Sequence, residues 1–401
     1  MNKDLAKKLA PVMMASAVAW FYTMIYAPLG YMYNSFPGMD SKVMLIAVLP
    51  GIIAMVGGFA AGALMNVIGK KTLILLSMLL MAVGGLMVRF IGEANINLVI
   101  FGSALTGFGA GAIPSVNMSV LALIAPDHLK DKVCGWADGV CLAGMFIVAM
   151  AAGFLAADGN WGRAFDVYWA VVVVLIFALM LYPNDKELKS GVSTEDVAAE
   201  TEVESVLPKS IVVLATMKFF CAIFYMGVGL FVSDYVINEM QIGTSAAVGT
   251  MQSLSSLLGM FASMFVFVFL KYMKGWEGTI MMIICGIGVY LTGISGTLLL
   301  VASGWFLQTL GANAYHSGNS TLIAMGPKGK AVGVASGLLL GAGFLGEALA
   351  GYVLPFIANI VFGNTLASSC MKIGGIGCVI CAVIVLPFFR SAYKLVFAEK
   401  Q

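Results

Sequence analysis

The stretch GALMNVIGKK, residues 62–71, separates two long apolar segments and sets the interpretation of the rest of the chain. Two glycines and an asparagine, residue types that favour turns, come before a pair of lysines. The flanking residues 43–66 and 72–91 are dominated by apolar side chains. A tight, positively charged turn between two such segments indicates two helices that cross a membrane and reverse direction at its surface.

The composition of the whole chain supports a membrane protein. Of its 401 residues, 61% are hydrophobic and only 10% are charged, whereas soluble domains are about 45–50% apolar and about 25% charged. So few charges also exclude a nucleic-acid-binding protein, which needs a basic face. A helix crosses the hydrocarbon layer with about 20 apolar residues. This length predicts twelve helical spans, at residues 10–34, 43–66, 72–91, 97–124, 133–156, 164–183, 210–233, 246–270, 277–296, 298–325, 331–357 and 368–390.

The alternating ten-residue strands of a membrane barrel are missing, so the backbone in lipid must be satisfied within helices. The loops then set the orientation. Most basic residues, from Lys3 near the N-terminus to Lys400 near the C-terminus, fall on the side of the two termini. The other side has only Lys42, Arg89, Arg163 and Lys372. The excess of positive charge predicts a multi-pass protein of the inner (cytoplasmic) membrane with both termini in the cytoplasm.

The longest polar stretch, residues 184–209, divides the spans six and six. We expect an N-terminal bundle at 1–183, a cytoplasmic linker at 184–209 and a C-terminal bundle at 210–401. WFYTMIYAPLG (20–30) and FFCAIFYMGVG (219–229) align at an offset of 199 residues, which places Tyr26 over Tyr225. This weak repeat fits two pseudo-symmetric halves.

GALMNVIGKK resembles the signature of the major facilitator superfamily, Gly-x-Leu-x-Asp-Arg-x-Gly-Arg/Lys-Arg/Lys, which lies between spans two and three. The matching residues are Gly62, Leu64, Gly69, Lys70 and Lys71. Asn66 replaces the usual aspartate and Val67 the usual arginine. Gly62 suits a close helix contact, Gly69 a tight turn and Asn66 a helix cap.

Two further motifs resemble the same family: WGRAF (161–165) at the entry to span six, and KDKVCGWADG (130–139) at the entry to span five. The resemblance implies two six-helix bundles around a central cavity that opens alternately to each side, lined by spans 1, 4, 7 and 10. It also implies a cytoplasmic gate, to which we assign Gly62, Asn66, Gly69, Lys70, Lys71 and Asp138. We expect Asp138 to pair with one of the two lysines.

Two differences from the family's motifs bear on which kind of transporter the chain resembles. SALTGFG (103–109) has Ser103 where many proton-coupled members have arginine, and AGMFIVA (143–149) lacks the proline typical of drug-efflux members. These two differences disfavour drug/proton antiport. AVGGLMVRF (82–90) and LTGFGAGAIPSV (105–116) weakly resemble permeases for small anions such as cyanate.

Ionisable residues within spans are functional candidates because burying them in a membrane is costly. Lys218, in span seven, either contacts substrate or extends to the cytoplasmic surface. Glu347, in the middle of GAGFLGEALAG (341–351), either carries a coupled proton or makes a structural hydrogen bond.

Further polar residues fall on the spans expected to line the cavity. NAYHSGNS (313–320) places three polar residues on one helix face, and span one carries a tyrosine stripe that either grips a solute or forms an interfacial belt. The predicted substrate-binding residues are Tyr22, Tyr26, Asn117, Lys218, Tyr225, Asn313, His316 and Asn319, with Glu347 as the proton-coupling residue. For His316, ordinary packing is the alternative.

No motif indicates an enzyme. A nucleotide-binding loop of the GxxxxGK[ST] type is missing, and we expect no catalytic residues, no metal site and no cofactor. The leading hypothesis is secondary active transport of a small organic solute, first of all an organic anion, with proton coupling and a monomeric protein in the bilayer. The alternatives are an exporter of amphipathic or cationic compounds and a non-transporting membrane receptor.

Overall fold

The computed structural model describes residues 3–65, 67–92, 95–126, 130–185, 209–325 and 330–397, and in these ranges the regular structure is entirely helical. Contacts divide the chain into two units, residues 1–194 with 244–253, and residues 195–243 with 254–401. Most of the predicted linker, residues 186–208, lies outside the described residues.

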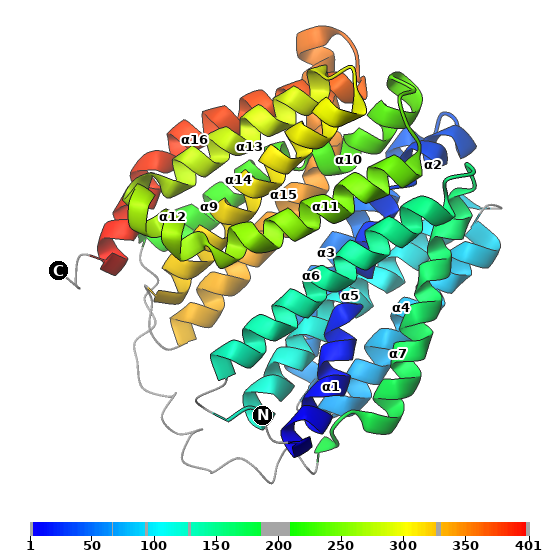
Figure 1. The fold of residues 1–401 in the computed structure, drawn as a ribbon, viewed down its shortest axis with the longest axis vertical. Helices are drawn as coiled ribbons and strands as arrows, with labels where there is room; N and C mark the ends of the chain where they lie inside the picture. Colours follow the sequence, from blue (N-terminus) through cyan, green and yellow to red (C-terminus); the bar gives the residue numbers. More distant parts are fainter. Residues whose placement is uncertain are drawn as a thin grey trace. The chain divides into compact units, whose positions relative to one another are not determined.

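The first unit holds the helices of the N-terminal half (Figure 1). Its elements are α1 (Lys3–Ala17), η1 (Phe21–Tyr26), α2 (Leu29–Ser35), α3 (Asp40–Leu64), α4 (Lys70–Ile91), α5 (Ile96–Ile124), α6 (Lys130–Leu155), η4 (Trp161–Val167) and α7 (Tyr168–Leu181). The second unit holds α9 (Lys209–Tyr225), α10 (Gly227–Asp234), η5 (Tyr235–Glu239), α12 (Val266–Met273), η6 (Lys274–Trp276), α13 (Glu277–Ile294), α14 (Leu298–Met325), α15 (Lys330–Phe362) and α16 (Ala367–Phe397). The remaining helix, α11 (Ser245–Met264), has its first residues in the first unit.

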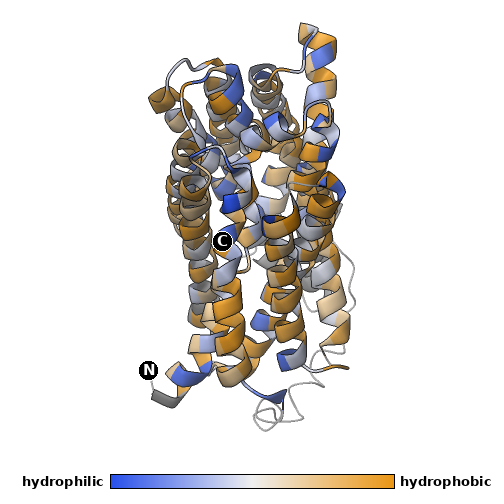
Figure 2. Cartoon of the chain, turned by 90° about the vertical axis from the view of Figure 1, so that its right-hand side faces the viewer, coloured by the Kyte–Doolittle hydropathy of each residue, from blue (hydrophilic) through white to orange (hydrophobic). Residues whose placement is uncertain are grey.

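Long hydrophobic stretches run along these helices (Figure 2). Counting only described residues, nine helical segments are long and apolar enough to span a membrane, and Gly139–Leu155 is a shorter apolar helix. Neither α11 nor α14 is a candidate by itself, because α11 carries serines and a glutamine and α14 carries NAYHSGNS. The helices confirm the predicted all-α membrane fold.

Spans one and seven, the two segments that align in sequence, are both interrupted helices. Span one passes from α1 through the 3₁₀-helix η1 to α2, and Pro28 at the second interruption has no N–H to continue the helical ladder. Span seven breaks at Met226 between α9 and α10, and continues as the π-helix η5. Interrupted helices at membrane depth are tolerated where protein or a polar cavity surrounds them.

Small residues bring the helices of each unit together. A side chain at Gly111 of α5 would meet the backbone of Ala54 on α3, and a side chain at Gly346 of α15 would meet the carbonyl of Phe219 on α9. Such contacts between backbones are typical of helix packing in membranes, where van der Waals contact rather than the hydrophobic effect holds helices together.

Candidate functional site

The second unit contains a buried lysine enclosed by aromatic rings. Lys218 of α9 is only 3% exposed. Its Nζ lies 4.7 Å from the ring centroid of Tyr225 and 5.7 Å from that of Tyr315 on α14. The aliphatic stem crosses α15 at Gly343, where an added Cβ would lie 3.3 Å from the lysine Cε. The ammonium therefore lies among three helices rather than at an exposed helix end.

Glu347 lies one turn of α15 beyond Gly343 and belongs to the same cluster. The hydroxyl of Tyr225 donates a hydrogen bond of 2.7 Å to its Oε1. Glu347 and Lys218 interact electrostatically, yet no hydrogen bond or ion pair to Lys218 occurs among the described residues. One tyrosine thus contacts the cation with its ring and the carboxyl group with its hydroxyl. We call Lys218, Tyr225, Tyr315 and Glu347 the Lys218 cluster.

Sequence reasoning missed three residues at this cluster. Tyr315 precedes His316 in NAYHSGNS, but an aromatic side chain in an apolar span is also typical of ordinary helix packing. Its hydroxyl lies 3.5 Å from the Sγ of Cys221, which donates to it. Gln308 donates to the Tyr225 carbonyl over 3.2 Å and satisfies backbone at the interruption of span seven. A glutamine inside an apolar span was the available signal for Gln308.

The predicted polar face of α14 is divided between different neighbours. Asn313 donates to the carbonyl of Thr309 and packs against Gly259 of α11. His316 interacts electrostatically with Lys218, and its Nδ1 has no hydrogen-bond partner among the described residues. Asn319 is fully buried. The structure thus brings His316, but not Asn313, to the Lys218 cluster.

In the first unit, Asn117 makes three hydrogen bonds to its neighbours. Its Nδ2 donates to the carbonyl of Val12 over 3.2 Å and to Ser16 Oγ over 2.9 Å, and its Oδ1 accepts from the Tyr182 hydroxyl over 2.8 Å. This network ties α5 to α1 and to the end of α7. It uses both amide hydrogens and one of the two acceptor positions of Oδ1, so the substrate role remains a prediction without support from geometry.

The tyrosines of span one lie on its irregular part. Tyr22, in η1, is 7% exposed and stacks on Trp20 with ring centroids 6.1 Å apart. Tyr26 ends η1 directly before Ala27 and Pro28, and is half-buried. Tyr225 has the corresponding position at the end of α9. The aligned tyrosines therefore both lie where their spans are interrupted.

The turn at GALMNVIGKK is closed by an acid that the sequence analysis did not select. Gly69 has φ +89°, a conformation that other residues resist, and it precedes the first turn of α4. The N–H of Lys70 donates to Oδ1 of Asp185 over 2.7 Å, so a residue that follows α7 caps α4. A Cβ on Gly69 would collide with the same carboxylate.

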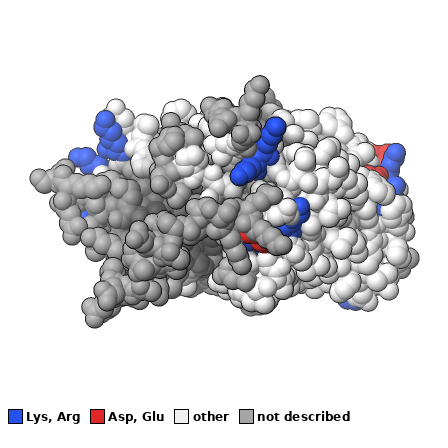
Figure 3. All heavy atoms as spheres, turned by 90° about the horizontal axis from the view of Figure 1, so that it is seen from below, with Lys and Arg blue, Asp and Glu red and all other residues white. Residues whose placement is uncertain are grey.

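The other gate predictions have different outcomes. The close helix contact expected at Gly62 is wrong for the described residues, because a Cβ there would meet no atom within 4 Å. The glycine lies at an exposed point near the end of α3. Asn66 and the side chain of Asp138 lie outside the described residues, and Lys70 and Lys71 are half-buried. Lys and Arg side chains are visible on the face seen in Figure 3, and acidic side chains lie next to some of them.

The motif WGRAF connects two spans at the end of the first unit that lies away from the GALMNVIGKK turn. Trp161 donates from Nε1 to Ser35 Oγ on α2 over 3.0 Å. Arg163 pairs with Asp158 at 2.6 Å. The N–H of Asn160 and the Arg163 guanidinium together lower the pKa of Asp158. These contacts bind the start of span six to the end of span one.

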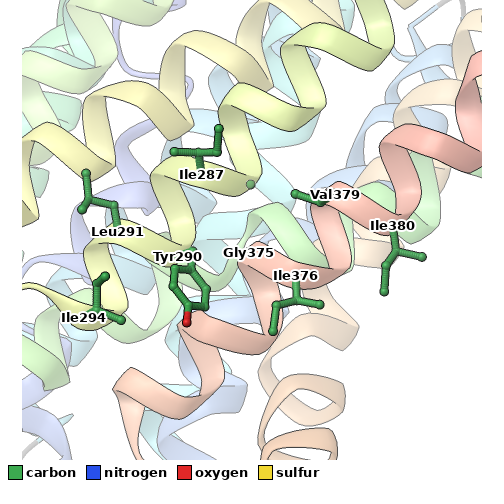
Figure 4. Close-up of a pocket in the computed structure, with 9 residues that line it drawn as sticks. Ile287, Tyr290, Leu291, Ile294, Gly375, Ile376, Val379 and Ile380 are labelled. Atoms are coloured by element: carbon green, nitrogen blue, oxygen red, sulfur yellow. The ribbon is translucent and has the colours of Figure 1, made fainter.

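An apolar groove of about 390 Å³ between α13 and α16 is separate from these residues (Figure 4). Its lining is almost wholly apolar, and Ile287 and Ile380 are more than half exposed on the side where lipid would lie. The groove is lined by Gly286, Ile287, Tyr290, Leu291, Ile294, Gly375, Ile376, Val379 and Ile380. It therefore offers no recognition chemistry for a polar solute.

The Major Facilitator Superfamily model matches residues 9–282. The fold is similar to the xylose transporter XylE from E. coli in a partially occluded inward-open conformation, at 12% identity and TM-score 0.72, covering 96% of this chain and 98% of that chain. It is also similar to the nucleoside transporter NupG, at 13% identity and TM-score 0.73, covering 95% and 99%. A bacterial homologue of the human lysosomal transporter Spinster, inward-facing and unoccupied, matches at 14% identity and TM-score 0.73, covering 100% and 99%.

No curated protein sequence matches the chain. The structural similarities, all below 25% identity, concern the fold alone. The family model, by contrast, covers more than half of the chain, from span one to the start of α13. The matched range contains most of the helical spans and the GALMNVIGKK turn described above. The chain belongs to the major facilitator superfamily and is a multi-pass membrane protein with the fold of its transporters.

Proposed function

We propose that this protein is a secondary transporter of a small organic anion, coupled to protons and working by alternating access in the cytoplasmic membrane. The observation that carries the proposal is Lys218, a buried ammonium group that lies against the rings of Tyr225 and Tyr315 and makes no ion pair with any described residue. Lysine has three donors, and aromatic faces stabilise its charge without accepting conventional hydrogen bonds from it. A carboxylate or similar anion is the ligand that would complete this environment.

Glu347 supplies a means of coupling. When Glu347 is ionised, its negative charge competes with an anionic solute for Lys218. When Glu347 is protonated, the solute carries the compensating charge. Proton binding at Glu347 and anion binding at Lys218 would then favour one another, as coupling between two sites requires. The hydrogen bond from Tyr225 holds the carboxyl group close enough to the lysine for this effect.

Export of lipophilic cations is the competing transport function. Glu347 and the surrounding rings would suit a cation, but Lys218 places a positive charge beside them. The like charge would repel a cationic solute at close range. The cluster therefore supports an anion better than a cation.

The proposal is tested by flux into proteoliposomes with a panel of labelled carboxylates, sugars and lipophilic cations. We expect uptake of one or more carboxylates, increased by an inward proton gradient. In Lys218→Met, which keeps a similar length without charge, apparent affinity should fall about tenfold or more, because a hydrogen bond to a charged group contributes about 1.5–3 kcal/mol.

The matched control is Lys271→Met. Lys271 is an exposed lysine of α12 in the same unit, and its removal should leave affinity unchanged. Transport confined to lipophilic cations, or equal anion affinity in Lys218→Met and the unmodified protein, would reject the proposed substrate class. The absence of flux for every solute under every gradient would favour a receptor.

A further inference from the structure

Glu277 is a buried acid that the proposed transport function does not use. It is the first residue of α13 and is 0% exposed. Both of its carboxyl oxygens lack a hydrogen-bond partner among the described residues. Glu347 differs, since it accepts a hydrogen bond from a tyrosine and interacts with a lysine. Within the described chain, Glu277 is therefore a fully buried carboxyl group with neither a hydrogen bond nor an ion pair to offset its loss of water.

The carboxyl group lies directly against α14. A Cβ built on Gly318 would stand 2.5 Å from Oε2 of Glu277 and 3.0 Å from its carboxyl carbon. The absence of a side chain at Gly318 is what leaves room for the acid. On the α16 side, the ring of Phe389 packs against Gly278, the next residue of α13.

The cations near this end of α13 are engaged elsewhere or exposed. Arg390 of α16 stacks over the ring of Trp276 at 4.7 Å, and Lys271 of α12 lies 5.8 Å from the ring of Tyr272. Lys274 of η6 is exposed, and His316 of α14 interacts with Lys218. None of these described groups makes an ion pair with Glu277.

An ionised carboxylate cannot remain in such a place without a strong penalty, because it has lost its water and gained no partner. The neutral acid has no such difficulty. We propose that Glu277 is a proton-binding site: it holds a proton while α13 packs against Gly318 of α14, and releases it when the two helix ends separate and water enters. Proton binding and this helix packing then stabilise each other.

The site would link protons to the position of α14. This helix also carries Tyr315 and His316, whose side chains face or interact with Lys218. Gly318 follows Tyr315 by a single turn, so a shift of α14 at Glu277 would also move Tyr315 relative to Lys218. The inference concerns Glu277 itself, and holds whether or not Glu347 couples transport.

Infrared difference spectroscopy of the full-length protein in lipid vesicles tests the site without any substrate. A protonated carboxyl group has a C=O stretching band that an ionised carboxylate lacks. We expect such a band at neutral pH, loss of one component in Glu277→Gln, and loss of a different component or none in Glu347→Gln. Glu239→Gln is the matched control, because Glu239 is an acid of the same unit that accepts a hydrogen bond from the Ser368 N–H.

Two further measurements keep the inference falsifiable if Glu277→Gln does not fold. In Gly318→Ala, the added methyl group should displace the carboxyl group toward water and decrease the component assigned to Glu277 at neutral pH. In the unmodified protein, a lipophilic carbodiimide, which reacts with protonated acids, should modify Glu277 at neutral pH and at least tenfold less at alkaline pH. Identical spectra for the unmodified protein and Glu277→Gln, or no carbodiimide adduct at Glu277 where that variant cannot be made, would overturn the proposal.

Discussion

Tyr225 has two separate functions in the Lys218 cluster. Its ring faces the Lys218 ammonium at 4.7 Å, and its hydroxyl donates to Glu347. The cation–π contact contributes roughly 0.5–2 kcal/mol, depending on how far water is excluded. A single rigid side chain thereby fixes the relative positions of a cation and an acid, so the charge state of Glu347 has a direct effect on Lys218.

Glu347→Gln should separate coupling from binding. Glutamine keeps the size of the side chain and an oxygen that accepts from Tyr225, but it cannot exchange a proton. We expect accumulation driven by a proton gradient to be abolished, while exchange of solute between loaded vesicles continues at a rate within a few fold of the unmodified protein. Both activities are measured on the same preparation of proteoliposomes.

Tyr225→Phe is the companion variant for this experiment. It retains the ring beside Lys218 and removes only the hydrogen bond to Glu347, so exchange should survive and gradient-driven accumulation should weaken. Retained accumulation in Glu347→Gln would exclude proton carriage by this acid. Loss of exchange as well would instead mean that Glu347 contacts the solute directly.

Individual site residues were predictable from sequence only in part. Lys218, Tyr225 and Glu347 stood out because ionisable groups and a repeated tyrosine are unusual inside apolar spans. Their proximity was not predictable, since it depends on how α9 and α15 pack at Gly343 and Gly346. Asn117 shows the opposite case: its polarity marked it as a candidate, whereas packing partners from α1 and Tyr182 account for all of its hydrogen bonds in this conformation.

Among the helices, spans one and seven are interrupted at places that the pattern of apolar residues does not predict. The alignment of Tyr26 with Tyr225 indicated a repeat, and both spans are interrupted just after these tyrosines. Pro28 could have signalled the first interruption. At the interruption of span seven, Met226 and Gly227 are both tolerated in membrane helices, so no residue there predicted a break. Tertiary contacts such as the one from Gln308 to the Tyr225 carbonyl hold the exposed backbone there.

Gly69→Val tests the turn before α4. A β-branched residue resists a φ of +89°, and its Cβ would collide with the Asp185 carboxylate that caps the helix. We expect turnover to fall about tenfold or more with little change in apparent affinity, because the proposed solute contacts lie in the Lys218 cluster and not at this turn. Initial rates over a range of solute concentrations separate these two quantities.

Gly62→Ala is the matched control in the same stretch, because a Cβ there meets no described atom within 4 Å. It should leave turnover unchanged. Asp185→Ala should lower the thermal stability of the folded protein by about 1 kcal/mol, the typical effect of losing a helix cap. Normal turnover in Gly69→Val would show that the turn takes no part in gating.

For the molecule as a whole, the fold was the most predictable property. Apolar stretches of about 20 residues leave few alternatives to membrane helices. The helices richest in polar residues, α11 and α14, are the weakest membrane spans by hydropathy, yet α14 carries Tyr315 and His316 beside Lys218. The polar residues that make α14 a candidate for solute binding also lower its hydropathy, so such residues are harder to predict than spans.

The orientation of the chain remains a prediction from its charges, and it can be tested by cysteine labelling. Lys7 in α1, Lys271 in α12 and Lys42 in α3 are exposed lysines near helix ends. The positive-inside rule places Lys7 and Lys271 in the cytoplasm and Lys42 outside. In a Cys134→Ser background, where the other six cysteines are buried, a membrane-impermeant maleimide should label Lys42→Cys in intact cells. It should label Lys7→Cys and Lys271→Cys only after the cells are permeabilised. The reverse pattern would invert the topology and place the GALMNVIGKK turn outside, and labelling of Lys7→Cys and Lys271→Cys from opposite sides would contradict an even number of spans between them.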